Sequence, residues 1–345
     1  MKAIVVRTPG GIDQMRLETL PDPVAGPRDV VIKVEACGVC FHDVLTRNGT
    51  LKAGVKMPCV LGHEISGTVV EVGRDVTQFK TGQRVATAQR YHVCGVCRFC
   101  RGGRETLCAE RKFLGDYGLV GGYGEYVAVE HDNVAAVPRN VPLAEASISA
   151  CAIGTCLNAI RDVGKVQMGE SVLVTGAGGG LGLHAVQLAR LAGAIVIAQT
   201  TSETKADLVR KMGAHHVIVH ARGEDFSPEV KRLSGGGVDV LIDNVGTPLF
   251  EPMRRSLGVA GRWILVGQLS GQFVPFNPAQ LFLKNQSMLA VTSVTRNQLV
   301  DVLALMARGD MKPIVTRSLP LEQAATAHTL VESGQAAGRI LLRPS

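Results

Sequence analysis

The sequence predicts a two-domain α/β protein, with a doubly wound parallel sheet in one domain and mostly antiparallel or barrel-like β structure in the other. At 345 residues the chain is long for a single core. From about residue 171 to 293, short β-rich runs alternate with helical patterns, as in a parallel sheet that carries helices on both faces. The first half has strand-like runs between glycine, proline and polar turns.

The expected elements follow the chain in order. In the first half, strands are expected at 2–6, 30–36, 64–73, 83–89 and 125–129. In the alternating region, they are expected at 171–175, 194–199, 216–220, 238–243 and 262–267. Ser227 with Pro228, and Thr247 with Pro248, have the residue types that open helices. The tail returns to helices ending near Gly309 and Gly334, and then to one strand. We expect one domain at 1–152 and 294–345 and the other at 153–293.

Composition and charge favour a globular protein without a nucleic-acid or membrane partner. Hydrophobic residues make up 46% of the chain, which is ample for burial. The net charge of +7 is scattered, and 4% aromatic residues are few for base stacking, so a nucleic-acid binder is the less favoured class. The longest uncharged stretch, 171–189, is interrupted by glycines and His184 and does not suit a membrane span. No targeting segment is visible, so we expect a cytoplasmic protein.

Four cysteines form a tight cluster within the expected lobe at 91–112. Their spacing is C-x2-C-x2-C-x7-C, at Cys94, Cys97, Cys100 and Cys108. Four thiolates at such spacing suit a closed structural zinc site, whose metal would supply the cohesion that a glycine-rich lobe lacks. Free or disulfide-bonded cysteines are the less favoured alternative, because the rest of the chain has the character of an intracellular protein.

A glycine-rich turn joins the strand at 171–175 to an amphipathic helix. Small residues there let the backbone approach a pyrophosphate, and the helix beyond presents free N–H groups and the positive end of its dipole. We therefore expect a dinucleotide site at Gly176, Ala177, Gly178, Gly179, Gly180, Leu181 and Gly182. The ends of the later strands, at Asn244, Val245, Val266 and Gly267, are expected to contact the same cofactor.

The end of the second strand of this region favours NADP(H) over NAD(H). An NAD-selective site would carry an acidic residue here for the ribose hydroxyls. The chain instead has Thr200, Thr201 and Ser202, followed by Lys205, which suit a 2′-phosphate. Ser202 as a helix cap and Lys205 as a solvated lysine are compatible with that role.

A second group of potential metal ligands is widely spaced. Cys40, His63 and Cys151 would supply the two cysteines and one histidine of an open catalytic zinc site. Asp43 would share a helical face with Cys40 and could orient the histidine, while Glu64 could approach the metal as a transient ligand. Taken alone, each residue also fits a buried structural role.

The chain resembles the zinc-containing medium-chain dehydrogenase/reductase superfamily of the alcohol dehydrogenase type. ACGVCFHD, LGHEISGTVVEVG, the four-cysteine segment, CAIGT, GAGGGLG and GRILL match it in order and cover nearly all of the sequence. The resemblance implies a GroES-like catalytic domain and a Rossmann domain. It also implies catalytic-zinc ligation by Cys40, His63 and Cys151, a near-metal role for Glu64 and a cofactor-phosphate contact for Arg339.

Three positions depart from the family pattern. Phe41 stands where a basic residue often follows the first cysteine ligand, and His42 stands where a serine or threonine usually relays the proton. A histidine can also pass a proton near neutral pH. Ala177 replaces a glycine of the turn, which is similar to the NADPH-using quinone oxidoreductase and acryloyl-CoA reductase branches.

We therefore expect a zinc-dependent oxidoreductase with two Zn²⁺ per chain. It would transfer hydride between NADP(H), or NAD(H), and an alcohol, aldehyde or ketone, with His42 as proton donor. Reduction of an activated C=C bond in an enone or an enoyl thioester stays open as the alternative, as does a cofactor-binding protein without turnover. We expect a homodimer or a homotetramer.

Overall fold

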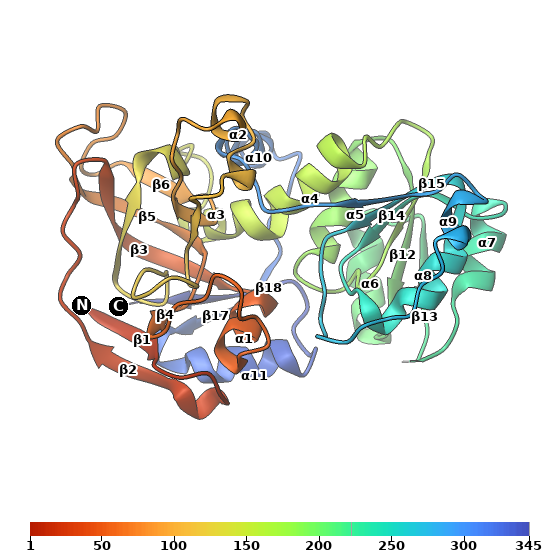
Figure 1. The fold of residues 1–345 in the computed structure, drawn as a ribbon, viewed down its shortest axis with the longest axis horizontal. Coiled ribbons are helices and arrows are strands. Elements are labelled where there is room, and N and C mark those ends of the chain that lie inside the picture. The colour runs from red at the N-terminus through yellow and green to blue at the C-terminus, as the bar shows by residue number, and fades with distance from the viewer. Residues whose placement is uncertain (222, 345) are drawn as a thin grey trace. The chain divides into compact units, whose positions relative to one another are not determined.

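The structure is a computed structural model that describes residues 1–221 and 223–344 (Figure 1). The chain divides into two compact units, one of Met1–Gly154 with Ser293–Ser345 and the other of Thr155–Thr292. The sequence placed these boundaries after residue 152 and before residue 294. The N-terminal part and the C-terminal tail therefore make one unit, and the middle of the chain makes the other.

The second unit contains a six-stranded sheet in which every neighbouring pair is parallel. Its strands are β11 (Ser171–Val174), β12 (Ile195–Thr200), β13 (His216–Val219), β14 (Val238–Asp243), β15 (Leu257–Leu265) and β16 (Ser287–Ala290). The order is β13-β12-β11-β14-β15-β16. This is the Rossmann order, in which ligands bind beyond the carboxyl ends of the strands where the order reverses, here at β11 and β14.

Helices connect these strands. They are α5 (Gly182–Leu191), α6 (Glu203–Lys211), α7 (Ser227–Ser234), α8 (Phe250–Ser256) and α9 (Ala279–Phe282). Ser227 was expected to cap α7 but is its first residue, and Phe226 stands at the N-cap. Thr247 and Pro248 form a 3₁₀ turn, Thr247–Leu249, that leads into α8. A buried tryptophan, Trp263, anchors the core of this unit.

The first unit is mostly antiparallel β structure, as the sequence predicts. Its strands are β1 (Lys2–Val6), β2 (Met15–Thr19), β3 (Asp29–Val39), β4 (Cys59–Val60), β5 (Glu64–Val72), β6 (Arg84–Thr87), β7 (Arg90–His92), β8 (Lys112–Phe113), β9 (Tyr126–Glu130), β10 (Val134–Ala136), β17 (Val315–Pro320) and β18 (Arg339–Arg343). The largest sheet runs β10-β6-β5-β3-β18-β17, with β9 also paired to β3. Its pairs are antiparallel except for β17 with β18.

The helices of the first unit are short apart from one. They are α1 (Phe41–Asn48), α2 (Arg98–Arg101), α3 (Leu143–Ala146), α10 (Arg296–Arg308) and α11 (Ala324–Glu332). Thr295 caps α10 by accepting from the backbone N–H of Gln298, and Gly309 ends the helix with a φ of 79°. A left-handed residue here favours glycine, which agrees with the helix end expected from the sequence.

A helical stretch continues from α3 through two π-helical segments, Ala150–Gly154 and Asn158–Val163, with α4 (Thr155–Leu157) between them. Among the described residues, Leu143–Val163 is the one helix long and apolar enough to cross a membrane. Its apolar window is 83% buried within the protein, which is the character of a core helix.

Candidate active site

The candidate catalytic metal ligands come from three places in the first unit. Cys40 directly follows β3 and stands at the N-cap of α1, and Glu64 is the first residue of β5, just after His63. Cys151 lies in the π-helical segment Ala150–Gly154, and such segments are frequent at functional sites. Antiparallel pairing of β3 with β5 sets Gly38 opposite Glu64, where a Cβ would lie 2.3 Å from Glu64 Oε2. A glycine is therefore needed to leave room for the carboxylate.

These four residues converge on one point. Single ligand atoms of Cys40, His63, Glu64 and Cys151 lie within 4.8 Å of one another, and all four side chains are buried. The sulfur atoms of Cys40 and Cys151 are 3.8 Å apart. Sulfur ligands at about 2.3 Å from a tetrahedral zinc ion stand about 3.8 Å from each other. His63 Nε2 and Glu64 Oε2 are buried without a hydrogen-bond partner, so the donor set fits a zinc ion that would satisfy them.

Arg339 also reaches this centre, although the resemblance assigned it to the cofactor phosphate. Pairing of β18 with β3 brings it there. Its Nη2 is 2.7 Å from Glu64 Oε1 and donates to the sulfurs of Cys40 at 3.5 Å and Cys151 at 3.6 Å. The contact with the Cys151 thiol, together with the positive charge of Arg339, lowers the pKa of Cys40 well below its usual value, although burial opposes it. The thiolate is the form that binds metal.

Asp43 lies next to His63. Its Oδ1 is 3.2 Å from His63 Nδ1, within ion-pair distance but without hydrogen-bond geometry. Oδ2 accepts from the backbone N–H of Cys40 at 2.9 Å, and Oδ1 accepts from that of Gly62 at 3.2 Å. The position fits the orienting role predicted for Asp43, with the second imidazole nitrogen left for the metal.

His42 faces a partner that the sequence analysis missed. Its Nε2 lies 2.8 Å from Asp116 Oδ2, and Asp116 Oδ1 accepts from the hydroxyl of Thr46 at 2.8 Å. Burial would lower the pKa of His42, but the Asp116 carboxylate outweighs it and raises that pKa above its ordinary value. The His42 ring is 5.1 Å from those of His63 and Phe113, so it stands beside the candidate metal ligand. Asp116 lies 74 residues further along the chain, in no motif.

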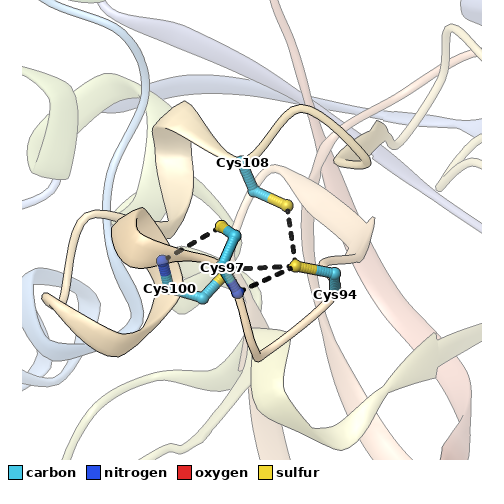
Figure 2. A group of neighbouring side chains, drawn as sticks. All are labelled: Cys94, Cys97, Cys100 and Cys108. Atoms are coloured by element: carbon cyan, nitrogen blue, oxygen red, sulfur yellow. Dashed lines mark hydrogen bonds between the residues drawn. The ribbon is translucent and has the colours of Figure 1, made fainter.

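The four lobe cysteines surround a second point (Figure 2). Cys94 Sγ is 3.9 Å from Cys100 Sγ and 3.6 Å from Cys108 Sγ. These spacings match a zinc tetrahedron and are far beyond the roughly 2.05 Å of a disulfide. The Cys94 sulfur accepts from the backbone N–H of Cys97, and the Cys97 sulfur accepts from that of Cys100. The latter bond lowers the pKa of Cys97 to about 7.

In the second unit, the glycine-rich turn lies between β11 and α5. The backbone N–H of Gly176 donates to Gln199 Oε1 at 3.0 Å, and that of Ala177 donates to Gln199 O at 2.8 Å. A Cβ on Gly182 would lie 2.3 Å from the carbonyl oxygen of Gly176. Only glycine allows this approach of the helix to the turn, which is the packing role of a glycine in dinucleotide-binding turns.

The other predicted cofactor residues of this unit lie at the same edge of the sheet. Asn244 Nδ2 donates to the carbonyl of Thr175 at 2.9 Å, and Gly267 N donates to that of Asp243 at 3.0 Å. These bonds connect the carboxyl ends of β11, β14 and β15. Val245 and Val266 are the chain neighbours of Asn244 and Gly267. Asn244 Oδ1 is buried without a partner.

At the end of β12, Ser202 does not make the helix-capping bond that the sequence allows. Thr200 is buried, and its hydroxyl accepts from the backbone N–H of Ser202, whereas Thr201 is exposed. Ser202 makes no capping bond to α6, and its hydroxyl is 2.8 Å from that of Thr204. A Cβ on Gly178 would lie 2.8 Å from Lys205 Cδ, so the lysine stem lies over the glycine-rich turn.

Comparisons with known proteins agree with both units. Residues 26–139 match the alcohol dehydrogenase GroES-like domain, and residues 180–308 match the zinc-binding dehydrogenase model. An acryloyl-coenzyme A reductase of Sulfurisphaera tokodaii is 34% identical over the whole of both chains. An NAD-dependent alcohol dehydrogenase of Sulfolobus acidocaldarius is 33% identical over 99% of each. A solved structure titled as that of AibC covers 100% of this chain and 96% of its own, at 42% identity and a TM-score of 0.92.

The chain therefore belongs to the zinc-binding dehydrogenases of the medium-chain dehydrogenase/reductase superfamily, and it is an oxidoreductase. The family, the GroES-like and Rossmann fold and the enzyme class predicted from the sequence are confirmed.

Proposed function

We propose that this enzyme transfers a hydride between a nicotinamide cofactor and the carbon of an alcohol, aldehyde or ketone. The observation that carries the proposal is the buried convergence of Cys40, His63, Glu64 and Cys151, in which His63 Nε2 and Glu64 Oε2 have no hydrogen-bond partner. These residues would hold one zinc ion and the four lobe cysteines a second. When bound, the first ion supplies a Lewis acid for the substrate oxygen.

The residues around this centre have separate roles in the proposal. Asp43 holds the His63 ring in one orientation, since its carboxylate is 3.2 Å from Nδ1. Arg339 offsets the negative charge of the thiolates and of Glu64. His42, held by Asp116, would pass a proton to or from the substrate oxygen.

We propose NADP(H) as the preferred cofactor, bound over the glycine-rich turn and the ends of β11, β14 and β15. The turn would approach the pyrophosphate, and the α5 N-terminus would face it. The Lys205 stem across Gly178 supports a contact with the 2′-phosphate, together with Thr200, Thr201 and Ser202. Arg339 remains a proposed contact of the cofactor phosphate, which requires its guanidinium to leave Glu64.

A second candidate is reduction of an activated C=C bond in an enoyl thioester. Two relatives named acryloyl-coenzyme A reductase, each 34% identical over 99% or more of both chains, favour it. The absence of a serine or threonine at the usual relay position, which His42 occupies, favours it also, because hydride addition to carbon needs no proton relay to a substrate oxygen.

One experiment separates the two candidates. The zinc content of the purified protein is measured, and NADPH and NADH oxidation is then followed with aldehydes, ketones, enones and acryloyl and crotonyl thioesters. Turnover of the aldehydes or ketones above the thioesters supports the first candidate, and the reverse supports the second. His63→Ala should keep the fold and lose turnover in either case. Full turnover by this variant would contradict the metal centre.

We propose that the protein forms a homodimer or a homotetramer. The segment from Leu269 to Leu283 supports this, because it exposes several large apolar side chains: Leu269, Phe273, Phe276, Phe282 and Leu283. Light scattering after size-exclusion chromatography measures the mass directly, and a 36.5 kDa monomer would contradict the proposal. None of the nine cysteines, all within the described residues, is in a disulfide, which supports a reducing compartment; we propose the cytoplasm, to be checked by cell fractionation.

A further inference from the structure

Two helices of the first unit carry interlocking polar pairs. Asp43 and Arg47 lie four residues apart on α1, and His328 and Glu332 lie four residues apart on α11, so each pair shares a helix face. The two helices lie side by side (Figure 1). Arg47, only 3% exposed, donates from Nη2 to Glu332 Oε1 at 2.7 Å and from Nη1 to Oε2 at 3.2 Å. Its Nη1 also lies 3.4 Å from His328 Nδ1.

The contacts continue from His328 to the candidate metal centre. His328 Nε2 is 3.1 Å from the hydroxyl of Tyr123, and that hydroxyl donates to Asp43 Oδ2 at 3.3 Å. His328 and Tyr123 are both fully buried. Since Asp43 Oδ1 lies 3.2 Å from His63 Nδ1, the contacts join the partly exposed Glu332 to a candidate metal ligand.

Only one arrangement of protons satisfies this series of contacts from Glu332 to Asp43. A guanidinium can only donate and a carboxylate can only accept, so Arg47 donates to both Glu332 and His328 Nδ1. The proton of neutral His328 is then on Nε2 and points at Tyr123, whose own proton points at Asp43. Burial lowers the pKa of His328 to about 4, so the ring stays neutral at physiological pH. All the hydrogen bonds therefore point in the same direction, toward the Asp43 carboxylate, and each one strengthens the next.

We infer that Arg47, Tyr123 and His328 are positioning residues that fix the Asp43 carboxylate against His63 and so hold the catalytic metal. This inference rests on the proposed function, because it requires an ion at His63. Asp43 Oδ2 has two donors, Cys40 N and the Tyr123 hydroxyl, and the second depends on His328. Without that hydroxyl, only the backbone N–H groups of Cys40 and Gly62 hold the carboxylate, so Asp43 fixes the direction of the His63 ring less firmly.

The test is the rate at which zinc leaves the protein for 4-(2-pyridylazo)resorcinol, which reports released zinc by absorbance. Tyr123→Phe removes only the hydroxyl, and His328→Leu removes both ring nitrogens. Release from the catalytic site, identified as the phase that His63→Ala lacks, should become about 10–100-fold faster in both variants. Release from the cysteine lobe should not change. His328→Gln should recover part of the slow release, because its amide can accept from Arg47 and donate to Tyr123.

Val134→Ala is the matched control. Val134 is fully buried in the core of the same unit, so the variant loses stability by cavity formation. It does not alter the hydrogen bonds from Glu332 to Asp43. Wild-type release rates in both Tyr123→Phe and His328→Leu would overturn the inference, as would an equal acceleration in Val134→Ala. Wild-type protein that carries only the lobe zinc would overturn the proposed metal centre itself, and the inference with it.

Discussion

Replacing Lys205 with alanine should weaken NADPH binding and leave NADH binding nearly unchanged. Lys205 lies in the first turn of α6, directly after β12, and its stem lies across Gly178 of the glycine-rich turn. A 2′-phosphate beyond the end of β12 would therefore meet the ammonium group. Burial lowers the pKa of Lys205, so the attraction should fade with rising pH sooner than for a solvated lysine, as the ammonium loses its proton.

The size of the effect follows from charge and exposure. Two unit charges 4 Å apart attract by about 1 kcal/mol in water and by about 4 kcal/mol at an effective dielectric constant of about 20. Lys205 is only partly buried, so the lower half of that range applies. A loss of about 1–2.5 kcal/mol corresponds to an increase of about 5–70-fold in the dissociation constant of NADPH.

The assay measures dissociation constants by quenching of protein fluorescence, and kcat/KM, for NADPH and NADH. Lys211→Ala is the matched control, because it removes the same charge from an exposed site on the same helix, about 9 Å further along. That distance exceeds the Debye length of about 8 Å at physiological salt. Equal losses for the two cofactors in Lys205→Ala would refute the reasoning, as would a wild-type preference for NADH of about tenfold or more.

Three further predictions concern the other sites. Cys97→Ser should remove one zinc per chain and lower both the melting temperature and the yield of folded protein, since the lobe depends on its metal; unchanged zinc content would contradict this. His42→Ala should lower kcat for carbonyl reduction by about 10²–10⁴-fold while zinc is retained, and His42→Ser should recover part of the rate. Asp116→Asn should cause a smaller loss, because it keeps the ring but removes the carboxylate that orients it and raises its pKa. A near-wild-type kcat in the alanine variant would favour C=C reduction. Gly182→Ala should weaken both cofactors alike, because its Cβ would lie 2.3 Å from the Gly176 carbonyl oxygen, and calorimetric titration that finds wild-type affinities would show that the turn tolerates it.

The parts of the site that are local in the chain could be predicted from residue spacing. The lobe cysteines stand within 15 residues, Cys94 to Cys108, so their spacing alone brings the sulfurs together. The glycine-rich turn is similar, because a strand, a turn and a helix follow one another directly. The prediction of Cys40, His63 and Cys151 as catalytic ligands depended on the resemblance to a family, since their spacing gives no sign that they meet.

The contacts that no pattern predicted join residues far apart. Asp116 meets His42 across 74 positions, and His328 meets Tyr123 across 205. The i, i+4 pairs of α1 and α11 were a signal for the contact of Arg47 with Glu332, but nothing in the sequence pairs those two helices. Arg339 reaches the candidate metal centre because β18 pairs with β3, and no motif in the sequence predicts this strand pairing.

The sequence by itself determined the class of fold and the zinc-binding dehydrogenase family, and it predicted the residues that we propose to carry the chemistry. These follow from periodicity, spacing and ordered motifs, which are properties of neighbours along the chain. Only the tertiary structure decided how those residues are held: Asp116 on His42, Arg339 on Glu64, and the path from Glu332 through His328 to Asp43. Each depends on sheet register and helix packing, because buried polar atoms must find partners wherever the folded backbone brings them.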